Sequence, residues 1–383
     1  MANWRTVKLG DVFSERTETN CIDLELLSVT GTRGIIPRSE IEGKDSSNED
    51  KSKYLKVCKG DIAYNTMRMW QGVSALSDYE GIVSPAYTVL VPTADVDAKY
   101  CSYLFKLPEI IFLFYRHSQG LVDDTRNLKY TNFAKISAKI PPLPEQHAIA
   151  EILTAADRAI AVRERLIAAK QKQKRWLMQN LLTGKMRLPG FSGEWETVQL
   201  GKYLVEHAEK TAENNQYPVL TSSRRGLFLQ SDYYNKEIAS ENNTGYNVVP
   251  YGYFTFRHMS DDEIFKFNIN TIVPKGIVST LYPVFTTKNI NDKFLLELLN
   301  YGDEFRRFVR TQKQGGSRTY VYFSKLQDLR VTLPPLPEQI AIAEILTVAD
   351  REIDLLNREL QQQRKVKKYL MQQLLTGRKR VSV

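Results

Sequence analysis

The chain has 383 residues, 53 Lys and Arg against 44 Asp and Glu, and a formal net charge of +9. This length suffices for two domains that each bury a core, and the excess of positive charge favours a polyanionic partner such as nucleic acid. The N-terminal residues form no secretion signal, and no apolar run reaches the roughly 18 residues of a membrane span, so the sequence predicts a cytoplasmic protein without a membrane partner.

A long internal repeat organises the chain. The segment 141–184, PPLPEQHAIAEILTAADRAIAVRERLIAAKQKQKRWLMQNLLTG, returns without a gap at 334–377 as PPLPEQIAIAEILTVADREIDLLNRELQQQRKVKKYLMQQLLTG. Ahead of these tails, WRTVKLG at 4–10 matches WETVQLG at 195–201, and GIVS at 81–84 recurs at 276–279. The repeat predicts two tandem units, each a divergent lobe followed by a shared tail. The predicted boundaries are a lobe at 1–141, a helix at 142–188, a lobe at 189–334 and a helix at 335–383.

The first lobe mixes two kinds of segment. Its β-branched and aromatic runs, such as GIVSPAYTVLVP, alternate with helical stretches such as DAKYCSYLFKLPEIIFLFYRHS, which predicts an α+β domain. Cys21, Cys58 and Cys101 are odd in number and widely spaced. They predict reduced, mostly buried thiols and neither a disulfide framework nor a zinc site.

Each tail predicts one long helix. Pro144 and Pro337 suit a first helical turn, and Gly184 and Gly377 suit the stops. A helix of about 40 residues would be about 60 Å long, more than a small lobe covers. We therefore expect the two helices to pair as an antiparallel coiled coil about a pseudo-two-fold axis; the alternative is that each packs on its own lobe. The apolar residues expected on the seam include Ile149, Ile152, Ile160, Ile167, Ile342, Leu356, Leu360 and Val366.

Two basic runs lie late in the predicted helices, at 170–175 and 364–368. Such runs are typical of a solvated or partner-docking face, and direct contact with DNA is the alternative.

The second lobe, like the first, carries basic and amide residues at three places: two turns after strand-like runs, and the stretch before the tail. Arg pairs with guanine and Asn with adenine in the major groove, so these places are candidate DNA-reading turns. For any one cation a solvated surface charge or a phosphate anchor is the favoured interpretation, and the case for DNA contact depends on the recurrence of the clusters in both lobes. The candidates are Thr32, Arg33, Asn65, Arg68, Arg126 and Lys129 in the first lobe, and Ser223, Arg224, Arg225, Arg257, His258, Lys313, Arg318 and Tyr320 in the second.

The doubled PLPEQ…LLTG tail, with its WxxVxLG and GIVS anchors, resembles the specificity subunit of type I restriction-modification systems over the whole chain. The resemblance implies two target-recognition domains that each read one half of a split, asymmetric double-stranded DNA site. It also implies that the paired helices set the spacing and dock two adenine-N6 methyltransferase subunits, which motor-nuclease subunits join. S-adenosylmethionine, ATP and Mg would then be bound by those partners and no cofactor by this chain.

Catalytic motifs are missing from the sequence. The Asp/Asn-Pro-Pro-Tyr/Phe motif of adenine methyltransferases and the GxxxxGK[ST] phosphate loop are both absent, and the four histidines show no metal-ligand spacing. The sequence therefore predicts no catalytic residue and no metal site. The alternatives are an autonomous nuclease or methyltransferase, and a structural adaptor whose lobes bind protein.

Overall fold

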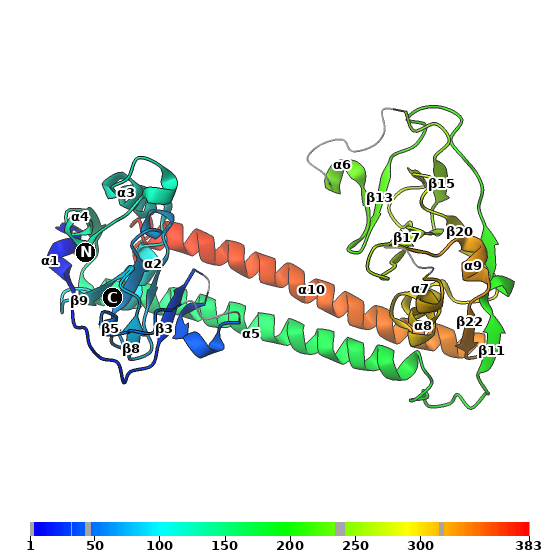
Figure 1. The fold of residues 1–383 in the computed structure, drawn as a ribbon, viewed down its shortest axis with the longest axis horizontal. Coiled ribbons are helices and arrows are strands. Elements are labelled where there is room, and N and C mark those ends of the chain that lie inside the picture. Colours follow the sequence, from blue (N-terminus) through cyan, green and yellow to red (C-terminus); the bar gives the residue numbers. More distant parts are fainter. Residues whose placement is uncertain (1–3, 32, 43–46, 234–241, 314–317, 383) are drawn as a thin grey trace. The chain divides into compact units, whose positions relative to one another are not determined.

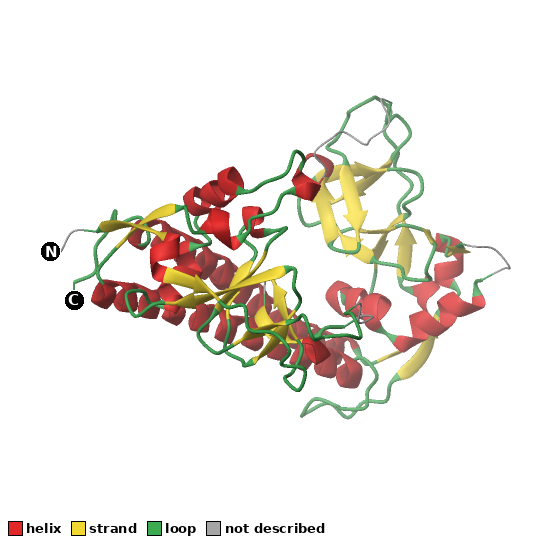
Figure 2. Ribbon diagram, turned by 60° about the vertical axis from the view of Figure 1, so that its left-hand side comes forward, coloured by secondary structure: helices red, strands yellow, loops and turns green. Residues whose placement is uncertain are grey.

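The computed structural model describes residues 4–31, 33–42, 47–233, 242–313 and 318–382. The chain forms two compact units, and each is described by itself. Unit 1 comprises Met1–Arg165 with Arg358–Val383, and unit 2 comprises Leu166–Asn357. Each unit thus contains one lobe and part of both long helices. The mixed helices and sheets confirm the predicted α+β class (Figure 2).

The lobe of unit 1 is built around a four-stranded antiparallel sheet in the order β2 (Phe13–Glu15), β9 (Tyr87–Pro92), β6 (Ile62–Asn65) and β7 (Ser74–Leu76). Three two-stranded ladders join β1 (Arg5–Lys8) to β10 (Ser137–Ile140), β3 (Leu27–Thr30) to β4 (Gly34–Pro37), and β5 (Leu55–Val57) to β8 (Gly81–Val83). The helices of the lobe are α1 (Leu9–Val12), α2 (Ala98–Leu104), α3 (Pro108–His117) and α4 (Tyr130–Phe133).

The lobe of unit 2 repeats this plan. Its four-stranded sheet has the order β12 (Leu204–Glu206), β20 (Val284–Thr287), β16 (Phe254–Phe256) and β18 (Phe267–Ile269). Its ladders join β11 (Glu196–Gln199) to β22 (Arg330–Leu333), β13 (Leu220–Ser223) to β14 (Gly226–Leu229), β15 (Asn247–Pro250) to β19 (Lys275–Val278), and β17 (Met259–Ser260) to β21 (Thr319–Tyr320). The helices are α6 (Gln230–Tyr233), α7 (Asp292–Tyr301), α8 (Asp303–Thr311) and α9 (Phe323–Gln327).

Aromatic rings fill the core of each lobe. In unit 1 the rings of Phe105 and Phe133 meet edge to face with centroids 5.8 Å apart, and both side chains are fully buried. In unit 2 Phe254 stacks on Phe285 at 4.9 Å. Phe254 and Phe256 lie two residues apart on β16 and flank the buried Thr255. Large buried aromatic rings of this kind contribute strongly to the packing of each lobe core.

The two tails form α5 (Leu143–Leu181) and α10 (Leu336–Leu374), helices of 39 residues each (Figure 1). In unit 1, Asp157 pairs with Lys367 and Glu164 with Arg364; in unit 2, Lys170 pairs with Glu352 and Lys174 with Asp350. Residue numbers rise on one helix as they fall on the other, so the predicted antiparallel pairing is confirmed. Four cations of the two basic runs therefore form ion pairs with the other long helix: Lys170, Lys174, Arg364 and Lys367.

Each lobe also packs on both helices. The core of unit 1 takes in Leu153 from the start of α5 and Leu374 from the end of α10, and that of unit 2 takes in Leu346 and Leu181 in the same way. The alternative in which each helix packs on its own lobe alone is therefore wrong.

Two residues expected on the helical seam are exposed instead: Ile152 is 36% exposed and Val366 45%. Ile152 was wrongly assigned because the buried positions at the helix starts are spaced by four residues, Ile149 with Leu153 and Ile342 with Leu346, all fully buried. In this buried stripe Leu153 takes the position that a regular heptad seam would give to Ile152, one residue earlier. Val366 lies off the stripe formed by Leu356, Leu360 and Leu374, which are the buried residues farther along α10.

The cysteines fit their prediction in part. All three are free, and Cys101 is buried, but Cys21 and Cys58 are only half-buried. None of the helices in the described residues is both long and apolar enough to cross a bilayer.

Candidate nucleic-acid interface

The repeated glutamine of PLPEQ fixes the start of each long helix to its lobe. The side-chain amide of Gln146 donates to the Pro141 carbonyl at 2.9 Å, and its oxygen accepts from the backbone N–H of Asp97 at 2.9 Å. Gln339 makes the same two bonds, at 2.9 Å to Pro334 and 3.0 Å to Asn291. Asp97 and Asn291 are the N-cap residues of α2 and α7, so the lobe helices are positioned by the tails.

The repeated glutamate holds the end of the other long helix. Both glutamates are buried: Glu145 accepts two bonds of 2.6 Å from Arg380, and Glu338 accepts two of 2.7 Å from Arg187. The guanidinium of Arg380 keeps the pKa of Glu145 below its usual value. The sequence could not indicate either pair, because a partner more than 140 positions away leaves no local signal.

The repeated tryptophans pack against the glycines that follow the two long helices. Gly184 and Gly377 follow the helices with φ of +67° and +72°, a conformation that side chains rarely adopt. A Cβ there would lie 3.4 Å from Trp195 and 3.3 Å from Trp4. Trp195 donates to Glu338 at 3.2 Å. The repeated residues therefore form a structural frame that supports the turns of each lobe. The frame consists of Trp4, Glu145, Gln146, Gly184, Trp195, Glu338, Gln339 and Gly377.

In unit 2 the structure brings the three predicted places together. Ser223, Arg224 and Arg225 form the tight turn between β13 and β14, and the Asn268 side chain donates to the Ser223 carbonyl at 3.0 Å from β18. Ser223, Arg224 and Arg257 line one hollow of about 210 Å³. Residues predicted from separate segments thus face a shared surface.

An acidic turn, residues 261–263, forms ion pairs with three of the candidate DNA-reading cations of unit 2. Asp261 accepts from Arg318 at 2.8 Å and Asp262 from Arg224 at 2.5 Å. Glu263 accepts from Lys313 at 2.7 Å. No pattern in the sequence had pointed to a role for this turn.

His258 and Tyr320 join the second and third places. Val321 N donates to the His258 carbonyl at 2.8 Å, beside the β17–β21 pair. The His258 ring lies 5.0 Å from Tyr322, which stacks on Tyr320 at 6.0 Å. Burial lowers the pKa of His258, so at neutral pH the ring is uncharged and offers hydrogen bonds and a stacking face.

Arg225 is held by aromatic rings. Its guanidinium lies 5.9 Å from the Phe228 ring centroid and 5.7 Å from that of Tyr233. Such contacts orient an exposed arginine and leave its N–H donors available.

In unit 1 the described contacts join two of the three places. Leu128 N donates to the Thr66 carbonyl at 2.9 Å, which matches the Val321–His258 bond of unit 2. Arg126 bonds Asp123 at 2.8 Å and lies 4.0 Å from the Tyr115 ring. The Trp70 ring also contacts Tyr115, with the two ring centroids 6.3 Å apart.

The other candidates of unit 1 have local contacts. Arg33 pairs with Glu40 at 3.0 Å, close to its own hairpin. The Asn65 side chain accepts from Met67 N at 2.9 Å, and Arg68 reaches Gln71 at 3.5 Å. Lys129 is the N-cap residue of α4. Thr32 lies outside the described residues.

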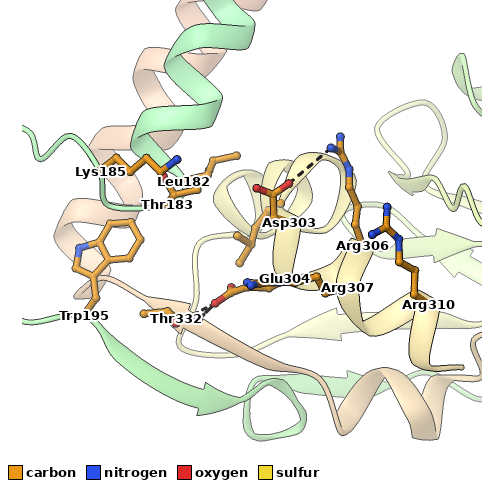
Figure 3. Close-up of a pocket in the computed structure, with 12 residues that line it drawn as sticks. Leu182, Thr183, Lys185, Trp195, Asp303, Glu304, Arg306, Arg307, Arg310 and Thr332 are labelled. Carbon is orange, nitrogen blue, oxygen red and sulfur yellow. Dashed lines mark hydrogen bonds and ion pairs between the residues drawn. The ribbon is translucent and has the colours of Figure 1, made fainter.

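A second basic hollow was not predicted from the sequence. It measures about 550 Å³ and lies where α8 approaches Trp195 and the end of α5 (Figure 3). Phe305 and Val309 of α8 are buried in the core, so the arginines of RRFVR are left exposed. The spacing of Phe305 and Val309, four residues apart with arginines around them, is the sequence signal that could have indicated an exposed basic helix face. The cations that line the hollow are Lys185, Arg306, Arg307 and Arg310.

A third hollow connects the two basic hollows of unit 2. It shares Ile264 and Phe265 with the smaller one, and Arg306 and Arg310 with the larger one. Asp262 and Glu263 also line this third hollow, so the path between the hollows carries carboxylates as well as the cations that a polyanionic ligand requires.

Comparison with known proteins identifies relatives along most of the chain. A family model described as "Type I restriction modification DNA specificity domain" matches residues 1–170 and 194–363. The chain is 26% identical over 365 residues to the MjaVIII specificity subunit of a type I restriction enzyme from Methanocaldococcus jannaschii, covering 86% of this chain and 83% of that protein. It is 25% identical over 371 residues to the putative MjaX specificity subunit of the same organism, covering 88% and 82%.

Solved structures share the fold. The HsdS subunit from Thermoanaerobacter tengcongensis is 17% identical and aligns over 98% of this chain and 97% of its own, with a TM-score of 0.51. The type I restriction-modification S subunit from M. genitalium is 14% identical and aligns over 97% and 96%, with a TM-score of 0.55.

Proposed function

Because the chain belongs to the type I restriction-modification DNA specificity family, with two copies of its domain, we propose that each lobe reads one half of a bipartite, asymmetric DNA site. The observation that carries this proposal is the convergence in unit 2 of Ser223, Arg224 and Arg257 on one hollow beside His258. Arginines and hydroxyl side chains on rigid turns are the groups that recognise base edges. A second site of different sequence is expected at the diverged turns of unit 1.

The same surface supplies both classes of contact that DNA recognition needs. Arg257 and Arg225 are the proposed base-reading cations, because no described carboxylate pairs with either side chain. Arg306, Arg307 and Arg310 are the proposed phosphate contacts, since they project from one helix beside the turns. Phosphate contacts position the lobe on the duplex and base contacts specify the sequence.

The paired helices are proposed to set the spacing between half-sites and to dock two adenine-N6 methyltransferase subunits. In this proposal the chain is a non-catalytic subunit, and motor-nuclease subunits join through the complex. The partners bind S-adenosylmethionine, ATP and Mg. The symmetry of the frame supports the docking of two like subunits, because both units present equivalent helix ends.

The test is the pattern of N6-methyladenine in a host that carries this chain with its methyltransferase partner. We expect a two-part motif with a fixed gap. Replacing residues 204–327 with the corresponding lobe of a relative is expected to change one half of the motif and leave the other half and the gap unchanged. Absence of a two-part motif, or a change in both halves, would contradict the proposal.

A further inference from the structure

The acidic turn 261–263 of unit 2 neutralises cations from three different segments of the lobe. Its three carboxylates take Arg318, Arg224 and Lys313 in consecutive order, at 2.8, 2.5 and 2.7 Å. All three cations were candidates for DNA contact on the basis of sequence. Three successive carboxylates thus face cations from positions 224, 313 and 318.

The turn has a defined shape. The Ser260 hydroxyl donates to Asp262 at 2.9 Å and to the Ile264 carbonyl at 3.0 Å. Glu263 adopts a φ of +63°, in the left-handed region, and its side chain accepts from Lys313. The bonds from Arg224 and Ser260 hold the pKa of Asp262 at about 2, so this carboxylate is ionised throughout the physiological range.

Unit 1 carries no acid at the corresponding place in its sequence. The segment from the end of β6, Asn65–Trp70, reads NTMRMW, whereas the segment that follows β16 contains three consecutive acids. The acidic turn is therefore a property of one recognition surface and not of the shared frame.

We propose that the acidic turn 261–263 competes with DNA phosphates for Arg224, Lys313 and Arg318, and so weakens the sequence-independent binding of unit 2 to DNA. This inference rests on the proposed function. Carboxylates and phosphates are both anionic acceptors for these side chains, so DNA must exchange three ion pairs to engage them. Arg257 lines the adjacent hollow without a described ion pair and remains available for base reading.

Such an exchange leaves a measurable signature in salt dependence. Binding that neutralises phosphates releases counterions from DNA, and the affinity then falls with salt in proportion to the number neutralised. When a displaced carboxylate stays beside the cation, each exchange neutralises less phosphate charge. Removing the carboxylates should therefore both strengthen binding and steepen its salt dependence.

The test compares the full chain with its D261N/D262N/E263Q variant on a duplex of random sequence, by fluorescence anisotropy across a salt series. We expect the variant to bind roughly tenfold more tightly, because exposed pairs are individually weak. The slope of log Kd against log salt should steepen by up to about 0.9 for each cation set free. The variant E194Q/E196Q/E206Q makes the same charge change at exposed acids of the same unit and is expected to leave the slope close to wild type.

Two further variants separate the competition from a structural role. Asp261 bonds Arg318 and takes no part in the Ser260 bonds, so D261N preserves the turn and should tighten binding roughly twofold. In an R224Q/K313Q/R318Q background, neutralising the turn should change neither affinity nor slope.

Weaker binding by D261N/D262N/E263Q, or an equal gain in the background without the cations, would overturn the inference. Unchanged affinity and slope would do so as well while DNA binding by the wild type stands. A wild-type chain without salt-dependent DNA binding would instead refute the proposed function.

Discussion

The two units differ in how their candidate arginines are held. In unit 1, Arg33 and Arg126 pair with acids three to seven positions away in the chain. In unit 2, cations from distant segments converge on the acidic turn 261–263. The frame shows no such difference, because its buried glutamates and glutamines recur in equivalent places. The contrast teaches that the repeated residues hold the fold and that the diverged turns carry what distinguishes the half-sites.

The largest expected effect tests the symmetry of the frame. Leu153→Ala and Leu346→Ala each remove a fully buried side chain at equivalent helix positions. Each should lower the free energy of unfolding by about 2–5 kcal/mol, and the two should agree within about 1 kcal/mol. Urea denaturation measures both. A much larger cost in one unit would show that the frames are not packed alike.

The glycines of GIVS should reveal a difference within the frame. A Cβ on Gly81 would lie 2.5 Å from the backbone oxygen of Glu25, whereas a Cβ on Gly276 meets the side chain of Leu220 at 2.4 Å. A side chain moves more easily than a backbone. Gly81→Ala should therefore cost more than Gly276→Ala, within about 1–3 kcal/mol for overpacking. Thermal unfolding of the pair checks the order, and the reverse order would contradict it.

Substitutions in the turns should affect one half-site at a time. Arg257→Ala is expected to cost about 1–3 kcal/mol and to relax the second half of the motif only. Asn65→Ala, at the equivalent strand end, should affect only the first half. Competition binding with DNA altered in each half measures both. Uniform weakening on every sequence would reassign the residue as a phosphate anchor.

The basic hollow of unit 2 should act without regard to sequence. R307Q/R310Q is expected to weaken binding to all duplexes alike and to reduce the salt slope by about 0.9 for each phosphate that is no longer neutralised. The variant K288Q/R330Q makes the same charge change at exposed cations elsewhere in the unit and serves as the control. If R307Q/R310Q alters base preference, the division between positioning and base-reading residues fails.

The smallest effect concerns a half-buried cation, Lys106, that precedes α3 in unit 1, where unit 2 has Tyr301 before α8. Lys106 donates to the Gly72 and Ser74 carbonyls at 2.6 Å, and burial lowers its pKa to about 8. A lysine in the unfolded chain keeps a pKa of about 10.4, so above pH 8 the unfolded chain binds more protons than the folded chain. The free energy of unfolding should rise from about pH 8 to 9.5, by a fraction of the roughly 1.4 kcal/mol per pH unit for one proton. Lys106→Met should remove this slope, and an unchanged slope would exclude Lys106 as its source.

Much of the fold could be predicted because its signals are local. Proline at the first turn, glycine at the stop and apolar spacing predict α5 and α10, and the gapless repeat predicts two like units. The predicted seam was wrong at Ile152 and Val366 because burial on these helices depends on what packs against them in space, and the spacing along the chain does not determine it.

The candidate site divides in the same way. The residue types at the turns and their places after strands could be predicted from the sequence, but the neighbours of those residues in space could not. The acidic turn 261–263 and the arginines of α8 carry no motif, since ion pairs and hollows arise between segments that are distant in the chain.

By itself, the sequence determined the two-unit plan, the long helices and the kinds of side chain that each lobe offers, because these depend on composition and on spacing along the chain. Only the tertiary structure decided which cations are neutralised, which remain available and why the PLPEQ and LLTG motifs recur. The physical reason is that charge pairing and burial depend on distance in space, and Glu338 meets Arg187 only after the helices pair.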